Sequence, residues 1–223
     1  MVRILVGTPL ASKNSVHEDF RVCYENAIIT CARNKIEVVS SVMVGSLLPS
    51  NRIRLCDKAI ERECDYVVMM DSDMVFDAEA IVRLIGHNKD VISGLYFKKQ
   101  PPYEPLAYMR SSKGEYSHID NIEKGGLLDV DAVGAGLLVI KTSILKDMPK
   151  PWFACPPLFL TYDKKSGFAL KKKGIKNLCL GEDMWFCYLA KQSGFDVVVD
   201  LDTKCYHIGD FHFGLSEYLQ CRS

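Results

Sequence analysis

Apolar residues in the first half of the chain follow two alternating spacings. Short continuous apolar runs, rich in Val and Ile, are typical of strands buried on both faces. Between these runs, apolar residues recur every three or four positions, which predicts helices with one buried face. The runs predict strands at residues 2–6, 36–44, 66–70 and 90–93, and the periodic segments predict helices at residues 16–33, 51–64 and 78–86.

Proline and glycine set the expected ends of these elements. Thr8 and Pro9 are expected to end the first strand, because proline cannot donate to a strand ladder. Pro49 and Ser50 precede the second helix and are expected to cap it. The positions of that helix expected to face the core are Ile53, Cys56 and Ile60.

The pattern changes in the second half of the chain. Strands that need not be parallel are predicted at residues 106–109 and within 127–140, and a proline-rich loop at 148–157. Gly181 precedes a helix expected to end near Ser193. Two further strands, at 196–199 and 204–207, would close the sheet. The whole predicts an α/β fold with a mostly parallel central sheet flanked by helices and a smaller antiparallel part in the C-terminal half.

We expect residues 1–223 to form a single domain, with halves at 1–95 and 96–223. The chain has 48% hydrophobic residues and 28 basic against 28 acidic residues, which argues against disorder and against a strongly basic nucleic-acid binder. The longest apolar run, residues 132–140, is far below the roughly 20 residues that span a bilayer. Nine cysteines without a Cys-x-x-Cys pair predict reduced, core-filling thiols and a cytoplasmic protein.

Charge is unevenly distributed despite the neutral total. Residues 57–79 hold eight acids and two bases, whereas residues 161–177 hold six lysines and one acid. The lysine-rich segment is either a solvated loop or a lid that closes over an anionic ligand.

The acidic pair Asp71 and Asp73 directly follows the apolar run at 66–70. Open α/β sheets bind ligands at the C-terminal ends of their strands, and paired carboxylates there suit Mg²⁺ or Mn²⁺ carried with a phosphate. The alternative is a polar turn that leads into the next helix through Asp77.

A second acidic pair, Glu182 and Asp183, begins the predicted helix after Gly181. Carboxylates at a helix start are stabilised by the helix dipole, and that role alone would explain them. The functional alternative is a general base beside a substrate cleft. His207 ends the last strand and offers either a structural hydrogen bond or a metal-binding nitrogen, with His212 competing for the second role.

Taken in order, these segments resemble one family. The matching pieces are residues 6–9, Asn51-Arg52, Asp71-Ser72-Asp73, residues 133–140, Gly181-Glu182-Asp183 and His207, and they extend over almost the whole chain. The chain is similar to metal-dependent nucleotide-sugar glycosyltransferases of the Rossmann-like GT-A fold, most of all to the inverting family-two group. The resemblance implies a nucleotide-diphosphate sugar, UDP-linked by expectation, as donor.

The resemblance also implies roles on the donor side of the site. Thr8 and Pro9 would lie beside the base and ribose, and Arg52 would approach the nucleotide or its diphosphate, with Arg54 competing. The remaining implied donor contacts are Asp71, the backbone of Gly134, Ala135 and Gly136, and the ring of Trp152. The glycines have an alternative role as a tight turn into the buried strand, and Trp185 has an alternative place in the core. Residues 44–46 lack the acid that the family often uses to hold uracil.

The catalytic and metal roles follow the same resemblance. Asp183 would be the general base, with Glu182 beside it, and Asp71, Asp73 and His207 would be the ligands of Mn²⁺ or Mg²⁺. The acceptor is open: a glycan, lipid-linked sugar, protein, small molecule or modified nucleic-acid base. The aromatic and proline-containing stretch 96–103 and the loop at Trp152 are the candidates for acceptor contact. Two other classes stay open, namely a haloacid-dehalogenase-type phosphatase that uses Asp71 and Asp73, and a non-catalytic nucleotide-sugar-binding module.

Overall fold

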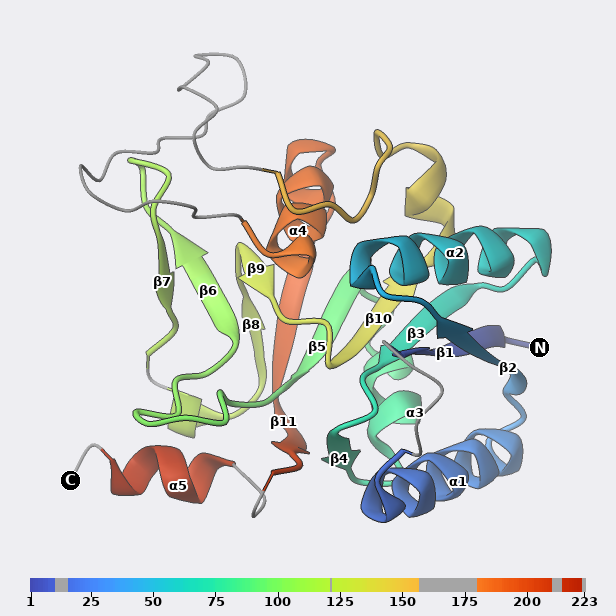
Figure 1. Cartoon of the computed structure of the whole chain (residues 1–223), viewed down its shortest axis with the longest axis horizontal. Helices are drawn as coiled ribbons and strands as arrows, with labels where there is room; N and C mark the ends of the chain where they lie inside the picture. Colours follow the sequence, from blue (N-terminus) through green and yellow to red (C-terminus); the bar gives the residue numbers. More distant parts are fainter. Residues whose placement is uncertain (11–15, 121, 157–179, 210–213, 222–223) are drawn as a thin grey trace.

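A computed structural model describes residues 1–10, 16–120, 122–156, 180–209 and 214–221 of the chain. Its centre is an eight-stranded sheet in the order β2-β1-β3-β10-β5-β11-β4, with β8 beside β11 (Figure 1). The strands that run in one direction are β1 (Arg3–Leu10), β2 (Glu37–Val44), β3 (Tyr66–Met70), β5 (Val91–Leu95) and β11 (Val197–His207). The opposed strands are β4 (Met74–Phe76), β8 (Leu127–Asp129) and β10 (Leu137–Lys141).

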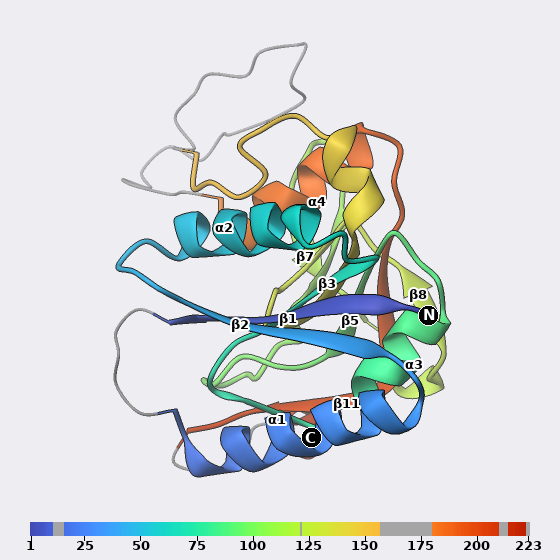
Figure 2. The same ribbon diagram turned by 90° about the vertical axis from the view of Figure 1, so that its right-hand side faces the viewer.

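Helices cover both faces of the sheet (Figure 2). One face carries α2 (Leu48–Glu61) and α4 (Glu182–Gln192), and the other carries α1 (Glu18–Arg33) and α3 (Ala80–Gly86). A small sheet of β7 (Tyr116–His118), β6 (Ala107–Arg110) and β9 (Ala132–Val133) lies beside α4, and α5 (Leu215–Gln220) follows β11. Two short 3-10 helices, Ile122–Lys124 and Thr142–Lys146, complete the described elements.

The predicted α/β class is therefore confirmed, with its mostly parallel sheet and its smaller antiparallel part. The expectation that cysteines fill the core is also confirmed, since Cys23, Cys31, Cys56, Cys64, Cys187 and Cys205 are buried. In the described ranges, no helix combines the length and apolar character needed to cross a bilayer.

Three predicted boundaries were wrong. β1 continues through Thr8 and Pro9 to Leu10, because β2 pairs with it over the full length, including Pro9 opposite Met43. The strands expected at 196–199 and 204–207 are one strand, β11, with a register shift between Asp200 and Lys204. Helix α2 begins at Leu48, since proline fits the first turn of a helix, where its missing N–H has no partner to lose.

The buried face of α2 also differs from the prediction. Its buried residues are Asn51, Arg52, Leu55, Cys56 and Ala59, whereas Ile53 and Ile60 are only partly buried. Gly7 explains the rotation, because a Cβ at that position of β1 would lie 2.6 Å from Leu55 Cδ2. The glycine lets Leu55 pack directly on the sheet, and this orientation turns Arg52 into the protein interior.

A buried carboxylate stabilises the irregular point of β11. Asp200 is 0% exposed and accepts hydrogen bonds from Arg83 Nε at 2.5 Å, Thr203 Oγ1 at 2.7 Å and the Asp202 N–H at 3.0 Å. Burial alone would raise the pKa of Asp200, but these hydrogen bonds bring it below its usual range. Beyond this point β11 pairs with β4, which places His207 opposite Met74 and close to Asp73.

Removal of the Arg83 charge tests this anchor. Arg83→Met leaves the Asp200 carboxylate buried with fewer partners, so we expect a loss of about 2–4 kcal/mol in the free energy of unfolding at pH 7. The lowered pKa of Asp200 means that its stabilising contribution exists above the unfolded pKa and fades as the pH falls through the folded pKa. Urea unfolding at pH 7 and in acid should therefore show a difference between variant and parent that shrinks in acid. An equal difference at both pH values would contradict the anchor.

Candidate active site

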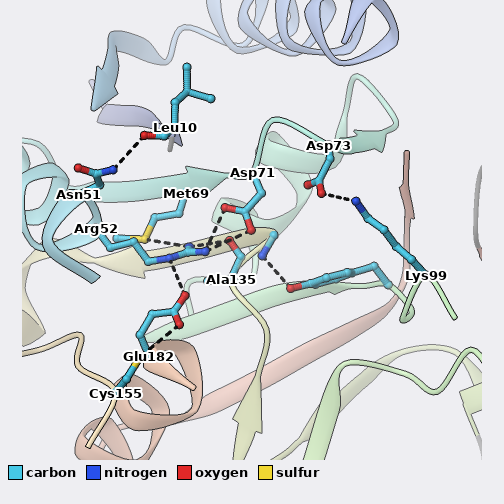
Figure 3. A network of polar contacts seen from close by, with 12 residues as sticks. Leu10, Asn51, Arg52, Met69, Asp71, Asp73, Lys99, Ala135, Cys155 and Glu182 are labelled. Carbon is cyan, nitrogen blue, oxygen red and sulfur yellow. Dashed lines mark hydrogen bonds and ion pairs between the residues drawn. The ribbon is translucent and has the colours of Figure 1, made fainter. Parts of the chain in front are cut away.

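A single arginine joins three parts of the chain at the C-terminal edge of the parallel strands (Figure 3). Arg52 Nη2 donates to Asp71 Oδ1 at 3.0 Å and Oδ2 at 3.2 Å, at the end of β3. Its Nη1 donates to the Ala135 carbonyl at 3.1 Å, in the turn before β10. Its Nε lies 3.3 Å from Glu182 Oε1, at the start of α4, as an ion pair outside hydrogen-bond geometry.

This arginine is enclosed by the protein. Its side chain is 2% exposed, against 28% for Asp71 and 15% for Glu182. Burial alone would lower the pKa of Arg52, but Asp71, Glu182 and Asp183 raise it, so the guanidinium stays charged. The resemblance predicts that Arg52 approaches the nucleotide or its diphosphate; in this structure its guanidinium contacts Asp71, Ala135 and Glu182.

Asp183 lies beside this network in the first turn of α4. Burial is the main cause that raises its pKa, Glu182 adds repulsion, and the pKa reaches about 6. Its Oδ1 accepts from the Met184 N–H at 2.7 Å, one of the first-turn N–H groups of α4 that have no partner within the helix. Burial likewise raises the pKa of Asp71. The structural role that the sequence left open for Asp183 is therefore present, and it coexists with a pKa suited to a general base.

Tyr96 begins the stretch 96–103 that the sequence offered for acceptor contact, and the structure buries it near Asp71 and Asp183. Its hydroxyl oxygen accepts from the Gly136 N–H at 2.7 Å, and the residue is 3% exposed. Burial raises the pKa of Tyr96 well above its usual range, and Asp183 and Asp71 raise it further. A Cβ at Gly134 would overlap the Tyr96 hydroxyl, and one at Gly136 would lie 2.9 Å from Tyr96 Cζ. Both glycines therefore form a turn that admits this ring.

Asp73 points away from Arg52 and is half-exposed. Its Oδ2 pairs with Lys99 Nζ at 2.5 Å, on the segment after β5 (Figure 3). Its carbonyl accepts from the Ile208 N–H at 2.6 Å, which ties the end of β11 to the turn that follows β3. Lys99 also lies in the stretch 96–103, but the sequence did not indicate its pairing with Asp73, since nothing in its local pattern relates it to an aspartate 26 positions earlier.

His207 is arranged as an imidazole with one nitrogen available. Its Nδ1 lies 2.5 Å from the Phe97 carbonyl, and a carbonyl only accepts, so Nδ1 carries the proton. Its ring meets the Tyr96 ring edge to face at 5.0 Å between centroids. Burial lowers the pKa of His207 and favours the neutral form. Histidines that bind metals commonly donate their other ring N–H to a carbonyl in this way.

The donor atoms fit a small metal site that a phosphate substrate would complete. The described residues contain no group of three or more His, Cys, Asp and Glu side chains able to hold a metal. Asp73 supplies a carboxylate and His207 a nitrogen, and Mg²⁺ is commonly bound by one or two protein ligands together with substrate phosphates. Both oxygens of Asp71, the third expected ligand, accept from Arg52. The arrangement therefore fits Asp73 and His207 better than the set of three.

The residues expected at the nucleotide form the end of β1. Thr8 and Pro9 are buried there, and Asn51 Nδ2 donates to the Leu10 carbonyl at 3.1 Å and to the Gly45 carbonyl at 3.0 Å. Asn51 thus holds the ends of β1 and β2 together, at the place where the family resemblance puts the base.

The two tryptophans are held by hydrogen bonds to the backbone. Trp152 is 2% exposed, and its indole N–H donates to the Met148 carbonyl at 3.3 Å. The indole of Trp185 donates to the Pro151 carbonyl at 3.0 Å. Trp152 is a core residue in this structure, with little surface for a sugar. The lysine-rich segment 161–177 and His212 lie outside the described residues.

Comparisons with known proteins support the fold. No family model and no curated protein matches the chain. Among solved structures, A197 from STIV aligns with 94% of this chain and 87% of its own, at 19% identity and a TM-score of 0.58. A glycosyltransferase involved in the glycosylation of the major capsid of PBCV-1 aligns with 74% of this chain and 73% of its own, at 11% identity and a TM-score of 0.36.

A further solved structure, mannose-1-phosphate geranyltransferase from Thermus thermophilus, aligns with 66% of this chain and 60% of its own, at 9% identity and a TM-score of 0.40. At 19% identity the similarity to A197 concerns the fold alone, and the two alignments with TM-scores below 0.5 support no conclusion. The chain has the α/β architecture predicted from its sequence, and membership of the family-two group stays a prediction.

The contact between the glycine turn and Tyr96 leads to a stability prediction. Gly136→Ala places a methyl group 2.9 Å from Tyr96 Cζ and 3.0 Å from Met74 Sδ, so we expect it to lower the free energy of unfolding by about 1–3 kcal/mol. Gly86→Ala is the matched control, because a Cβ there meets nothing within 4 Å. Urea unfolding should leave the control within about 0.5 kcal/mol of the parent. Equal effects of the two substitutions would show that Tyr96 does not fill this space.

Proposed function

We propose that this chain is a glycosyltransferase that moves a sugar from a nucleotide-diphosphate donor to an acceptor hydroxyl. The observation that carries the proposal is the joining of two acidic pairs by Arg52 at the ligand-binding edge of an α/β sheet, with the pKa of Asp183 raised to about 6. A carboxylate with this pKa is ionised at pH 7 and still basic enough to accept a proton.

The transfer step assigns Asp183 as the general base. The acceptor hydroxyl gives its proton to the Asp183 carboxylate while its oxygen forms a bond to the anomeric carbon. The bond from that carbon to the diphosphate oxygen breaks, and its electron pair leaves with the diphosphate. Attack from the face opposite the leaving group inverts the anomeric centre, through an oxocarbenium-like state as in glycoside hydrolysis.

The donor side of the site is assigned to Asp73 and His207. Together with the diphosphate they would hold Mn²⁺ or Mg²⁺, which when bound supplies Lewis-acid stabilisation to the departing group. Asp73 is half-exposed, and His207 keeps Nε2 available because Nδ1 faces the Phe97 carbonyl. UDP is the proposed nucleotide, with Thr8 and Pro9 beside its base and ribose.

Arg52 acts in this scheme as a positioning residue. Its bonds to Asp71 and Ala135 and its ion pair with Glu182 fix the distance between the end of β3, on the proposed donor side, and the start of α4. An uncompensated buried arginine or carboxylate would cost several kcal/mol, so the four groups stabilise one another.

The engagement of Asp71 distinguishes this proposal from a phosphatase. An aspartyl nucleophile needs a carboxylate oxygen free to attack phosphorus, whereas both Asp71 oxygens accept from Arg52. A trapped aspartyl-phosphate on Asp71 would reverse this preference. A non-catalytic binding module would bind a nucleotide sugar without releasing the nucleotide. A donor screen with Mn²⁺ and Mg²⁺ that reads both thermal shift and nucleotide release distinguishes such a module from a glycosyltransferase.

Asp183 gives the first functional prediction. Asp183→Asn should lower kcat for transfer or donor hydrolysis by about 10²–10⁴-fold, because the amide cannot accept the acceptor proton. In the parent, kcat/KM should rise with pH through about 6, as the carboxyl loses its proton. Nucleotide affinity measured by calorimetry should change little in the variant. Full turnover by a folded Asp183→Asn variant would remove Asp183 from the role.

The proposed metal ligands, Asp73 and His207, give the second functional prediction. Asp73→Asn and His207→Ala should each reduce the Mn²⁺-dependent part of nucleotide diphosphate affinity by at least about tenfold, because each removes a ligand. Asp77→Asn is the charge-matched control, since Asp77 is exposed four residues further along the chain. Calorimetric titration with Mn²⁺ and with EDTA makes the comparison. An unchanged Mn²⁺ dependence in both ligand variants would refute the site.

A further inference from the structure

The candidate site has a charge problem if it binds a diphosphate. Asp71, Asp73, Glu182 and Asp183 gather at one edge of the sheet, and a nucleotide diphosphate brings further negative charge to it. Arg52 does not offset the added charge, because it is 2% exposed and already serves Asp71 and Glu182. An exposed cation near Asp73 would offset this charge in addition to any metal.

Lys99 has the position and the freedom for this role. Its ammonium pairs with Asp73, and the two side chains are 40% and 43% exposed. Ion pairs with this much exposure contribute little to stability, so the ammonium is easily redirected. A lysine also reaches a new partner through its flexible four-carbon stem without any change of the backbone.

The backbone just before Lys99 is held by three contacts. Phe97 forms an isolated bridge with Pro105, and the Lys98 N–H donates to the Glu104 carbonyl at 3.0 Å. The Phe97 carbonyl also faces His207 Nδ1. The same short segment therefore orients the proposed metal ligand and presents the lysine, which keeps the Lys99 stem beside the donor site while its tip moves.

We propose that Lys99 is a further catalytic residue that pairs with Asp73 in the free protein and with the donor diphosphate in the complex. The proposal rests on the glycosyltransferase function proposed above. In this role Lys99 helps to neutralise the charge of the leaving diphosphate, which the sequence resemblance assigned to the metal alone or with the lysine-rich segment 161–177. No bond is made or broken by the lysine, which acts through charge and hydrogen bonding alone.

This exchange of partners has two opposite consequences. Lys99 competes with a metal ion for Asp73 in the absence of donor, so its removal should favour metal binding. It attracts the diphosphate once the donor arrives, so its removal should weaken nucleotide binding. A lysine that merely stabilises the fold would produce neither effect.

The test first titrates the full chain calorimetrically with UDP, GDP, CDP and ADP at saturating Mn²⁺. The nucleotide that binds most tightly is then used with each variant. Lys99→Met should weaken its binding about tenfold, the effect of one charge-assisted hydrogen bond, and Lys99→Arg should stay within about threefold of the parent. Lys98→Met is the matched control, because it removes the same charge from a neighbour whose ammonium pairs with Glu104. It should stay within about threefold of the parent. Mn²⁺ alone should bind Lys99→Met up to about fivefold more tightly.

A second comparison, made in EDTA so that no metal is bound, isolates the exchange of Lys99 between Asp73 and the diphosphate. Asp73→Asn should tighten diphosphate binding by releasing Lys99, and Lys99→Met in the same chain should abolish the gain. Parental affinity in Lys99→Met at saturating Mn²⁺, or a gain that persists in the double variant, would overturn the Lys99 proposal alone. Failure of the parent to bind any of the four nucleotides would instead overturn the glycosyltransferase function, and the role of Lys99 with it.

Discussion

The burial of one guanidinium among carboxylates is the interaction on which the site depends. Arg52 is 2% exposed and contacts Asp71, Ala135 and Glu182, which belong to three separate segments of the chain. Isolated charges at this depth would be strongly unfavourable, so the arginine and its acids are stable only as a set. The end of β3, the turn before β10 and the start of α4 therefore meet at one place, at the edge of the sheet where open α/β folds commonly bind ligands.

The same burial determines what each charged residue can do. Asp183 shares the enclosed environment, and its pKa rises to about 6, whereas Asp73 lies outside the enclosure and pairs with Lys99. Enclosed groups can position and accept protons, and the half-exposed groups can exchange partners with a ligand. The proposed glycosyl transfer uses this division: Asp183 on the acceptor side, and Asp73, His207 and Lys99 on the donor side.

The sequence predicted most of the architecture, because continuous apolar runs and 3.6-residue periodicity report burial directly. Strand β3 and helix α4 were found at nearly their observed bounds, so the two acidic pairs were placed correctly on their elements. The rotation of α2 could not be predicted, since it depends on the contact between Gly7 and Leu55 across two elements. The packing of Tyr96 could not be predicted for a similar reason: Gly134 and Gly136 indicate a close approach, but nothing in their spacing names the ring that approaches.

A crystal structure of the chain with a nucleoside diphosphate and Mn²⁺ tests the account most directly. We predict the diphosphate and the metal between Asp73, His207 and Lys99, with Arg52 still enclosed between Asp71 and Glu182. An Arg52 side chain withdrawn from its carboxylates to hold the diphosphate, or a nucleotide bound away from this edge of the sheet, would contradict the account.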